Sequence, residues 1–393
     1  MSKILHIVGD SKYGGASLII EKLANAAKEQ GHQVSVLATD SMFRERLADA
    51  GIEVVPLNCV WRPIRPTRDI IGLIRLKRFL ASKAFDIVHT HTSKGGFVGR
   101  VAARWAGVPI IIHTVHGFAF HEASSPYALK FYSMLERLAA HCCDSIVTVS
   151  KFHCDWAQKL GISDPAKCLA IPNGIDAARV KARKSRASVR DKLAIQKDEI
   201  MCFTAGRLAK QKGLDILLHA LAGIKRPHLI RAIIAGEGPD REKLEQLRDD
   251  LHLQDTVNFV GFRKDLGDLL HASDIVVLPS LREGLSISLL EAMAAGKPVI
   301  TTDIGSNLEV SRNGQLARII RVGRTSELAR AILELAADEN ERRRLGERGL
   351  AEFQKYYTDE AMVNAYMALY DRLVKQETKH VKRIAFLVNR CWF

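Results

Sequence analysis

Residues 3–38 read KILHIVGDSKYGGASLIIEKLANAAKEQGHQVSVLA and hold the pattern that decides the fold. The apolar run at 4–8 predicts a buried strand, and apolar residues at helical spacing over 16–30 predict a helix that Gly31 ends. A second apolar run at 34–38 predicts the next strand. A strand, a crossover helix and a second strand form the unit of a parallel sheet, so the chain begins as an α/β protein.

The same alternation continues to a strand at 145–149 and restarts with a strand at 201–205. Between these strands lies the turn-forming segment Ile171-Pro172-Asn173-Gly174-Ile175-Asp176. We therefore expect two doubly wound, Rossmann-like parallel-sheet domains facing a cleft. The expected divisions are domains at 1–172 and 173–357, a helix at 358–377 that packs back on the first domain, and a tail at 378–393 of unknown role, with a strand over its residues 383–393.

Composition places the chain among globular proteins. Its 393 residues suit two domains, with 47% hydrophobic and 26% charged residues. Its apolar stretches fall short of the ~18–20 residues needed to cross a bilayer, and Asp10 interrupts the place where a signal peptide would stay apolar, so we expect a cytoplasmic protein. Seven scattered cysteines without a Cys-x-x-Cys pair argue against a disulfide framework or a structural zinc site.

The net charge of +14 favours an anionic partner. Residues 62–83 concentrate cations among isoleucines and leucines, and two interpretations stay open. The segment is either a basic amphipathic helix on an anionic membrane surface or a helix whose apolar stripe packs on its own sheet. A second basic run, Arg179 to Lys192, we interpret as a solvated linker or helix face rather than a phosphate contact.

Two loops that follow strands have residues suited to phosphate. Gly14 and Gly15 open the first helix, where backbone N–H groups can approach an anion, although a simple tight turn is an equal alternative. After the strand at 201–205, Arg207 and Lys212 flank a loop that enters a helix. Together they could hold a diphosphate and stabilise its departure without a metal ion.

The most specific element is Arg282-Glu283-Gly284-Leu285-Ser286-Ile287-Ser288-Leu289-Leu290-Glu291-Ala292. A helix beginning near Leu285 would offer its N–H groups and Ser286 to an anion. Eight residues at helical rise would separate the two glutamates by about 12 Å, near the span from a ribose across a diphosphate to a sugar. Apolar neighbours predict that Glu291 is shielded and needs a partner.

Histidines cluster near the ends of two strands of the first domain, in Asp86-Ile-Val-His89-Thr-His91 and Ile112-His113-Thr114-Val115-His116-Gly117. His116 is the best candidate for contact with a sugar hydroxyl or with charge near the anomeric carbon, and a structural hydrogen bond is the equal alternative. A zinc site made of these four histidines is disfavoured, because no acidic or thiol ligand accompanies them at suitable spacing.

Together these residues resemble the retaining glycosyltransferases of family four, which have the GT-B fold. The resemblance runs from about residue 3 to 376. It rests on five motifs in order: Gly14-Gly15, Thr114-Val115-His116-Gly117, Pro172-Asn173-Gly174-Ile175-Asp176, Gly206-Arg207 with Lys212-Gly213, and Glu283 with Glu291. It implies that 1–172 is the acceptor side and 173–357 the nucleotide-sugar-binding domain.

The resemblance also implies a role for each matching residue. Arg207 and Lys212 would bind the donor diphosphate, and Glu291 the ribose. Glu283 would contact the hydroxyls of the transferred sugar and, with His116, stands at the reacting centre. The remaining expected contacts are backbone at Gly284, Leu285 and Ser286 to the donor, Gly14 and Gly15 to phosphate, and the segment Val260-Gly261-Phe262-Arg263 to the base.

The implied reaction retains anomeric configuration, with the leaving phosphate helping to deprotonate the acceptor. No cofactor and no metal are expected, since the chain has no Asp-x-Asp motif. The segment from His89 to His121 resembles bacterial enzymes that extend lipopolysaccharide, capsule or exopolysaccharide on a lipid-linked or saccharide acceptor. That likeness implies a UDP-sugar donor and a protein peripheral on the inner face of the plasma membrane.

Two other functions are weighed against this one. A sugar-nucleotide 2-epimerase of the same fold would need acidic groups that move a proton at carbon 2, and no obvious set is present. A basic nucleic-acid-binding protein is the alternative of another class, but the charge is spread over both halves and no recognition module is legible. We expect no nucleic-acid partner.

Overall fold

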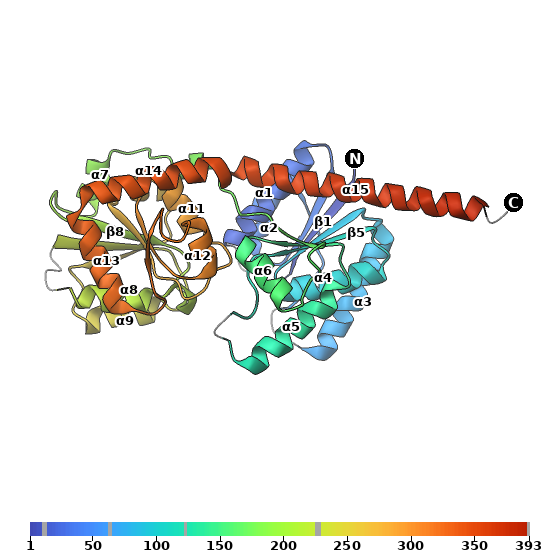
Figure 1. Ribbon diagram of the computed structural model, residues 1–393, viewed down its shortest axis with the longest axis horizontal. Coiled ribbons are helices and arrows are strands. Elements are labelled where there is room, and N and C mark those ends of the chain that lie inside the picture. Colours follow the sequence, from blue (N-terminus) through green and yellow to red (C-terminus); the bar gives the residue numbers. More distant parts are fainter. Residues whose placement is uncertain (10–13, 62–64, 122–123, 225–228, 391–393) are drawn as a thin grey trace. The chain divides into compact units, whose positions relative to one another are not determined.

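A computed structural model describes residues 1–9, 14–61, 65–121, 124–224 and 229–390, with side chains described to residue 379. The chain divides into two compact units, Met1–Pro172 with Glu360–Phe393, and Asn173–Asp359. Each unit is built around its own parallel sheet (Figure 1). In the described part of the chain no helix has both the length and the apolar character that a membrane crossing requires.

The first unit holds a seven-stranded sheet in the order β3-β2-β1-β4-β5-β6-β7. Its strands are β1 (Lys3–Gly9), β2 (Gln33–Ala38), β3 (Glu53–Val54), β4 (Ile87–His91), β5 (Ile110–Val115), β6 (Ser145–Thr148) and β7 (Cys168–Ala170). Its helices are α1 (Gly15–Glu29), α2 (Ser41–Asp49), α3 (Pro66–Lys83), α4 (Ser93–Trp105), α5 (Pro126–Ala140) and α6 (Lys151–Lys159). The described strand pairs are parallel, as the alternation predicted.

The second unit repeats the plan with a six-stranded sheet in the order β10-β9-β8-β11-β12-β13. Its strands are β8 (Ile200–Ala205), β9 (Ile230–Ala235), β10 (Val257–Gly261), β11 (Ile275–Leu278), β12 (Val299–Thr302) and β13 (Arg318–Ile320). Its helices are η1 (Ala177–Val180), α7 (Arg186–Lys192), η2 (Lys210–Lys212), α8 (Leu214–Ala222), α9 (Arg241–Asp250), α10 (Leu266–Ala272), α11 (Ile287–Ala294), α12 (Gly305–Val310), α13 (Thr325–Ala337) and α14 (Glu339–Tyr356). The predicted restart at 201–205 is therefore a strand, β8.

The C-terminal segment differs from its prediction. Helix α15 runs from Asp359 to Arg390, so the strand expected over 383–393 is wrong as far as Arg390, and residues 391–393 lie outside the described ones. Extending an existing helix adds a hydrogen bond per residue without a new nucleus, whereas a strand needs a neighbour to pair with. Tyr366 and Tyr370 of α15 are buried in the first unit, where Tyr370 Oη lies 2.6 Å from His89 Nδ1.

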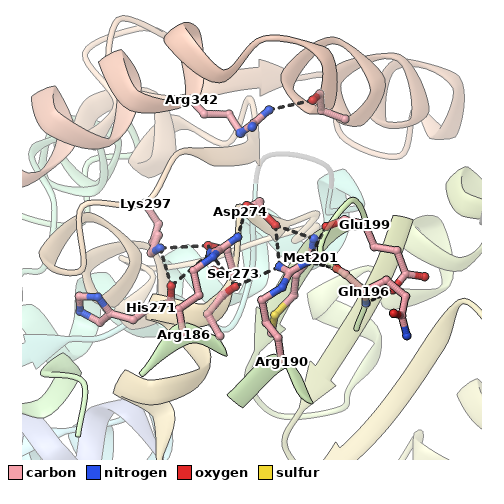
Figure 2. Close-up of polar contacts among 12 residues, drawn as sticks. Arg186, Arg190, Gln196, Glu199, Met201, His271, Ser273, Asp274, Lys297 and Arg342 are labelled. Carbon is pink, nitrogen blue, oxygen red and sulfur yellow. Dashed lines mark hydrogen bonds and ion pairs between the residues drawn. The ribbon is translucent and has the colours of Figure 1, made fainter. Parts of the chain in front are cut away.

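The basic run from Arg179 to Lys192 is also more than a solvated face. Arg190 of α7 is only 6% exposed and reaches the amino-terminal edge of the second sheet (Figure 2). Its guanidinium bonds Asp274 at 3.0 Å and the carbonyls of Gln196 and Glu199 at 2.7 and 2.6 Å. A buried cation needs such partners. Arg190 therefore fastens α7 to the sheet, and removing Asp274 would leave a buried charge uncompensated.

Candidate active site

The strand order reverses at the corresponding place in both sheets. β1 lies beside β4 and β8 beside β11, so in each unit the strand order reverses between a first strand and its non-consecutive neighbour. In doubly wound sheets ligands bind beyond the carboxyl ends of the strands at this switch point. The loops after β1, β4, β8 and β11 are therefore where functional side chains should gather.

A pocket opens at the switch point of the second sheet. Glycines let the chain fold closely around it: Gly213 has a φ of +63°, and a Cβ there would collide with the carbonyl of Pro279. A Cβ on Gly236 would likewise meet the carbonyl of Gly206. The residues that line the pocket are Thr204, Ala205, Gly206, Arg207, Leu208, Lys212, Leu214, Ile234, Ala235, Leu278, Pro279 and Ser280.

Two of the predicted phosphate-binding cations line this pocket. Arg207 is exposed, while Lys212 is partly buried at the end of η2. Lys212 Nζ donates to Glu283 Oε1 at 2.6 Å, and the Ser280 hydroxyl donates to the same oxygen at 2.9 Å. The structure thus brings Arg207, Lys212 and Glu283 to one place. The ammonium is bonded to a carboxylate, and a phosphate is an equally suitable partner for it.

The loop before α11 is arranged differently from its prediction. The helix begins at Ile287, two residues later than expected, because the Ser286 hydroxyl caps it by accepting from the Leu289 N–H at 3.4 Å. Ser286 and Leu285 are buried, and Asn173 of the turn segment donates to the Leu285 carbonyl at 3.4 Å. Since Glu283 lies outside the helix, the separation of about 12 Å predicted from helical rise does not follow.

Glu291 of α11 is shielded and partnered, as its apolar neighbours predicted. It is 5% exposed, and its Oε1 accepts from Arg179 Nε at 3.0 Å. Burial raises the pKa of the Glu291 carboxyl, against the opposing charges of Arg179 and Lys212. Lys212 thus acts electrostatically on Glu291 as well as bonding Glu283. The two acids and two cations form a group that we name the Lys212 cluster: Arg179, Lys212, Glu283 and Glu291.

The remaining predicted contacts are spread more widely. Arg263 is held by Asp265 through two hydrogen bonds of 2.8 and 2.7 Å, which fix the orientation of its guanidinium. Gly261 beside it ends β10 with a φ of +67°. In the first unit, Gly14 precedes α1 in an extended conformation and Gly15 begins the helix. The predicted loop residues 10–13 lie outside the described part of the chain.

Three histidines of the first unit are joined in a row by hydrogen bonds. His6 lies on β1, His91 ends β4, and His116 follows β5. His6 Nδ1 is 3.0 Å from His91 Nε2, and His91 Nδ1 is 3.1 Å from His116 Nε2. Burial lowers the pKa of His6 and of His116 to about 4, and that of His91 well below its usual value. All three rings are therefore uncharged at neutral pH.

Proton counting links the two ends of this histidine row. A neutral imidazole carries one proton, and each of the two hydrogen bonds uses one, which leaves a single proton for the outer nitrogens, His6 Nε2 and His116 Nδ1. Both outer nitrogens lack a hydrogen-bond partner within the described ranges. His116 Nδ1 is therefore an acceptor when His6 Nε2 is a donor, and a donor when His6 Nε2 is an acceptor. His6 thereby helps to decide whether the outer nitrogen of His116 donates or accepts.

The other predicted histidines lie within strands rather than beyond them. His89 donates or accepts at both nitrogens, with Tyr370 Oη at 2.6 Å and Thr114 Oγ1 at 2.7 Å. His113 Nδ1 is 2.9 Å from the hydroxyl of Thr90. Hydrogen bonding accounts for both, so they are structural.

A metal is a poorer account of this cluster. His6, His89 and His91 do bring nitrogens within 4.8 Å of one another, a spacing that a metal ion can use. Yet His6 and His91 bond each other, and both nitrogens of His89 are bonded. A metal would have to displace these bonds in a fully buried place.

Sequence reasoning missed two members of these groups. Arg179 was assigned to a solvated run, although the unpaired Glu291 called for a cation and η1 packs against α11. His6 was read as part of an apolar strand, and its place beside His91 depends on β1 pairing with β4, where His6 stands opposite His89. The paired residues of β1 and β4 are 83 positions apart in the chain, and local sequence does not predict such a pairing.

Family models match both halves of the chain. A model described as "Glycosyltransferase Family 4" matches residues 13–179, and one described as "Glycosyl transferases group 1" matches residues 185–351. The two models meet at the segment where the chain divides into its two units.

Curated relatives and solved structures agree with these matches. The UDP-Gal:alpha-D-GlcNAc-diphosphoundecaprenol alpha-1,3-galactosyltransferase of Escherichia coli is 33% identical over 290 residues, which cover 72% of this chain and 74% of the relative. The N,N'-diacetylbacillosaminyl-diphospho-undecaprenol alpha-1,3-N-acetylgalactosaminyltransferase of Campylobacter jejuni is 24% identical over 380 residues, or 94% and 99% of the two chains. Anabaena HepE, solved with UDP-glucose, has a TM-score of 0.81 at 22% identity, covering 95% of this chain and 100% of HepE.

The likeness to HepE extends over both units and shows the fold. The identity to the Escherichia coli enzyme extends over most of both chains. On the fold, the two family matches and this identity, the chain belongs to glycosyltransferase family 4, and it is a sugar-nucleotide-dependent glycosyltransferase of GT-B architecture.

Proposed function

We propose that the chain transfers a hexose or N-acetylhexosamine, with retention, from a UDP-sugar to a saccharide linked to a polyprenyl diphosphate. The observation that carries the donor half is the Lys212 cluster, which places two cations and two carboxylates beside the pocket after β8. A nucleoside diphosphate sugar offers the matching groups, namely two phosphates between two hydroxyl-bearing sugars. The bound UDP-glucose in HepE supports uracil as the base.

In this proposal Arg207 and Lys212 hold the diphosphate. A phosphate that takes Lys212 from Glu283 leaves that carboxylate free to accept from the hydroxyls of the transferred sugar. Glu291 accepts from the ribose hydroxyls while Arg179 keeps its charge balanced. Backbone N–H groups around Gly284, Leu285 and Ser286 meet the donor. Gly14 and Gly15 offer backbone N–H groups to phosphate, and the backbone at Arg263 reads the base.

The transfer exchanges one bond at the anomeric carbon for another. The bond from this carbon to the β-phosphate oxygen breaks, and a bond to the acceptor oxygen forms on the same face of the sugar. The acceptor hydroxyl proton passes to the leaving phosphate oxygen, so charge and atoms balance. Arg207 and Lys212 stabilise the charge that develops on the diphosphate. His116, kept neutral by burial, hydrogen-bonds the sugar near the reacting centre.

The acceptor half of the proposal comes from the relatives. The Escherichia coli and Campylobacter jejuni enzymes are both named for acceptors joined to undecaprenol through a diphosphate. A shared acceptor class would place this chain in the assembly of a surface polysaccharide, at the inner face of the plasma membrane. The donor sugars of those two enzymes differ, so we assign the class of the sugar and not its identity.

A panel assay tests the proposal. The purified full chain is incubated with UDP-, GDP- and TDP-sugars, with and without undecaprenyl-diphosphate-linked N-acetylglucosamine, and both nucleotide release and the product's anomeric configuration are measured. We expect UDP release that depends on the lipid-linked acceptor, with a retained linkage. Conversion of the sugar at carbon 2 without an acceptor would instead establish an epimerase, and an inverted product would overturn the retaining assignment.

A further inference from the structure

Helix α5 displays an apolar stripe to solvent. Tyr127, Phe131, Met134 and Leu138 follow one another at helical spacing on one face, and they are 88%, 50%, 48% and 57% exposed. The opposite face of the same helix is buried at Ser133, Ala139 and Ala140. Isolated exposed apolar residues are ordinary, but four along one helix face form a patch that calls for a partner.

Helix α3 repeats this arrangement. Its inner face, with Leu76 and Leu80, is buried against the first unit. Its outer face exposes Ile70, Ile71 and Ile74. The helix therefore has two apolar faces. One stripe packs inward, as one interpretation of the segment 62–83 expects, and a second stays open to solvent.

These two helices belong to one layer. Helix α4 packs against both α3 and α5, and the three helices lie beside one another in the first unit (Figure 1). Trp105 at the end of α4 is 59% exposed. Crossover helices run antiparallel to the strands, so α3 and α5 both begin near the carboxyl edge, where His116 lies. We name the exposed apolar residues of this layer the α3–α5 surface: Ile70, Ile71, Ile74, Trp105, Tyr127, Phe131, Met134 and Leu138.

Charge on these helices is positive and mostly unbalanced. The two acidic side chains of the layer are already engaged, Asp69 with Lys94 at 2.7 Å and Glu136 with Arg100 at 2.7 Å. Lys77 and Arg78 follow the exposed isoleucines one turn along the same helix. The exposed cations of these helices that are not paired with the two acids are Arg68, Arg75, Lys77, Arg78, Lys83, Arg104, Lys130 and Arg137.

We propose that the α3–α5 surface binds an anionic lipid bilayer, with its apolar and aromatic side chains in the headgroup region and its cations on lipid phosphates. Tyr and Trp favour the membrane interface, and cations beside apolar residues are the composition of interfacial helices. A second copy of this chain fits less well, because like-charged surfaces would meet and lysine is depleted from protein interfaces. Charge complementarity therefore selects the bilayer.

The proposed function gives this surface a purpose, since a polyprenyl-linked acceptor lies in the membrane. The inference rests on the proposed function only for the biological reason to bind a membrane, and not for the observations that support binding. Lipid binding is measured without turnover, and turnover can be measured with a short-chain acceptor in solution. Either proposal can therefore fail while the other stands.

Vesicle flotation tests the inference. The full chain is floated with vesicles of phosphatidylcholine alone and with vesicles of equal parts phosphatidylcholine and phosphatidylglycerol, at low and high salt. One variant carries Tyr127→Ser, Phe131→Ser, Met134→Ser and Leu138→Ser, and another carries Arg75→Gln, Lys77→Gln and Arg78→Gln. Matched controls remove exposed residues elsewhere, Met42→Ser with Leu333→Ser, and Lys197→Gln with Lys243→Gln and Arg330→Gln.

We expect the wild-type chain to float with the anionic vesicles and to be released by salt. Each surface variant should lower the partition coefficient at least tenfold, while both controls match the wild type. Thermal melts and turnover on a soluble acceptor show that the variants are folded. Failure of the wild type to bind anionic vesicles would overturn the proposal. So would a dimer in solution that the apolar variant dissolves while vesicle binding is unchanged.

Discussion

The carboxyl edges of the two sheets share a topology and differ in chemistry. At the switch point of the second sheet stand charged groups, with Lys212 bonded to Glu283 and Arg179 bonded to Glu291. At the switch point of the first sheet stands a row of uncharged histidines that ends at His116. One edge is suited to holding phosphates and hydroxyls, and the other to presenting a neutral donor or acceptor.

This difference teaches that the fold fixes where a ligand binds, while the side chains decide how. The amino-terminal edge of the second sheet provides a contrasting example. Arg190 is a cation there too, but its donors are taken up by Asp274 and by backbone carbonyls (Figure 2). Such a buried and bonded cation stabilises the fold, whereas Arg207 and Lys212 line the pocket in which the proposed function places a ligand.

The largest effect should come from the charged edge. Lys212→Ala removes a cation from the departing diphosphate and leaves the Glu283 carboxylate to repel it. Loss of one such stabilising group lowers kcat by about 10²–10³-fold, and we expect that range. Initial rates with the UDP-sugar identified by the panel measure it. Lys210→Ala, two residues away and exposed, is the matched control and should keep full activity. A kcat of Lys212→Ala within tenfold of the wild-type value would show that this cation does not stabilise the departing diphosphate.

The neutral edge should affect rate more than affinity. His116→Ala is expected to lower kcat about 10²-fold while donor affinity, by isothermal titration, falls less than about tenfold. The reason is that the proposed function places His116 at the reacting centre and not at the phosphates. Equal losses in rate and affinity would assign it to donor binding instead.

His6→Leu tests the histidine row itself. It breaks the bond to His91 without touching a ligand, so we expect a partial loss of kcat with unchanged donor affinity and a shifted pH–rate profile. His153→Leu is the matched control, because burial lowers the pKa of His153 to about 4 as well but its Nδ1 bonds Ser150 outside the row. If His153→Leu had the same effect as His6→Leu, the histidine row would have only a structural role.

A further effect is expected from Glu291, the residue that the proposed function assigns to the ribose. Glu291→Ala should weaken donor binding about 10–100-fold, because hydrogen bonds to a charged group are worth roughly 1.5–3 kcal/mol. Isothermal titration with UDP alone measures the contribution of Glu291 to nucleotide binding, separately from the transferred sugar. Glu327→Gln, which removes a carboxylate paired with Arg321 at the surface, serves as the control. Unchanged UDP affinity in Glu291→Ala would show that the ribose does not bind at Glu291.

The last prediction concerns the effect of acid on the stability of the first unit. Burial lowers the pKa of His6 and His116 from 6.5 to about 4, so between these values the unfolded chain binds protons that the folded first unit refuses. Stability of that unit should fall as pH drops from about 6.5 to 4, by about 1.4 kcal/mol per pH unit for each such histidine. The four tryptophans of the sequence, Trp61, Trp105, Trp156 and Trp392, all lie outside the second unit, so urea titrations followed by tryptophan fluorescence report on the first. A pH-independent midpoint would contradict the neutral histidine row.

Much of this architecture could be predicted from the sequence. Alternating apolar runs and helical periods gave two parallel sheets, and turn residues gave the boundary at 171–176. Arg207, Lys212 and Glu283 follow strands, so topology alone brought them to one edge. The C-terminal strand was wrong, because an apolar run of that length suits a strand or a helix equally until its neighbours are known.

The sequence by itself determined the fold class, the family and the loops in which chemistry should lie, because period, glycine placement and motif spacing are local properties. Tertiary structure alone decided that Arg179 balances Glu291, that His6 stands in a row with His116, and that α3 and α5 leave apolar faces open. Each of these features depends on contacts between segments that are far apart in the sequence, because those contacts determine which side chains are buried and which charges are paired.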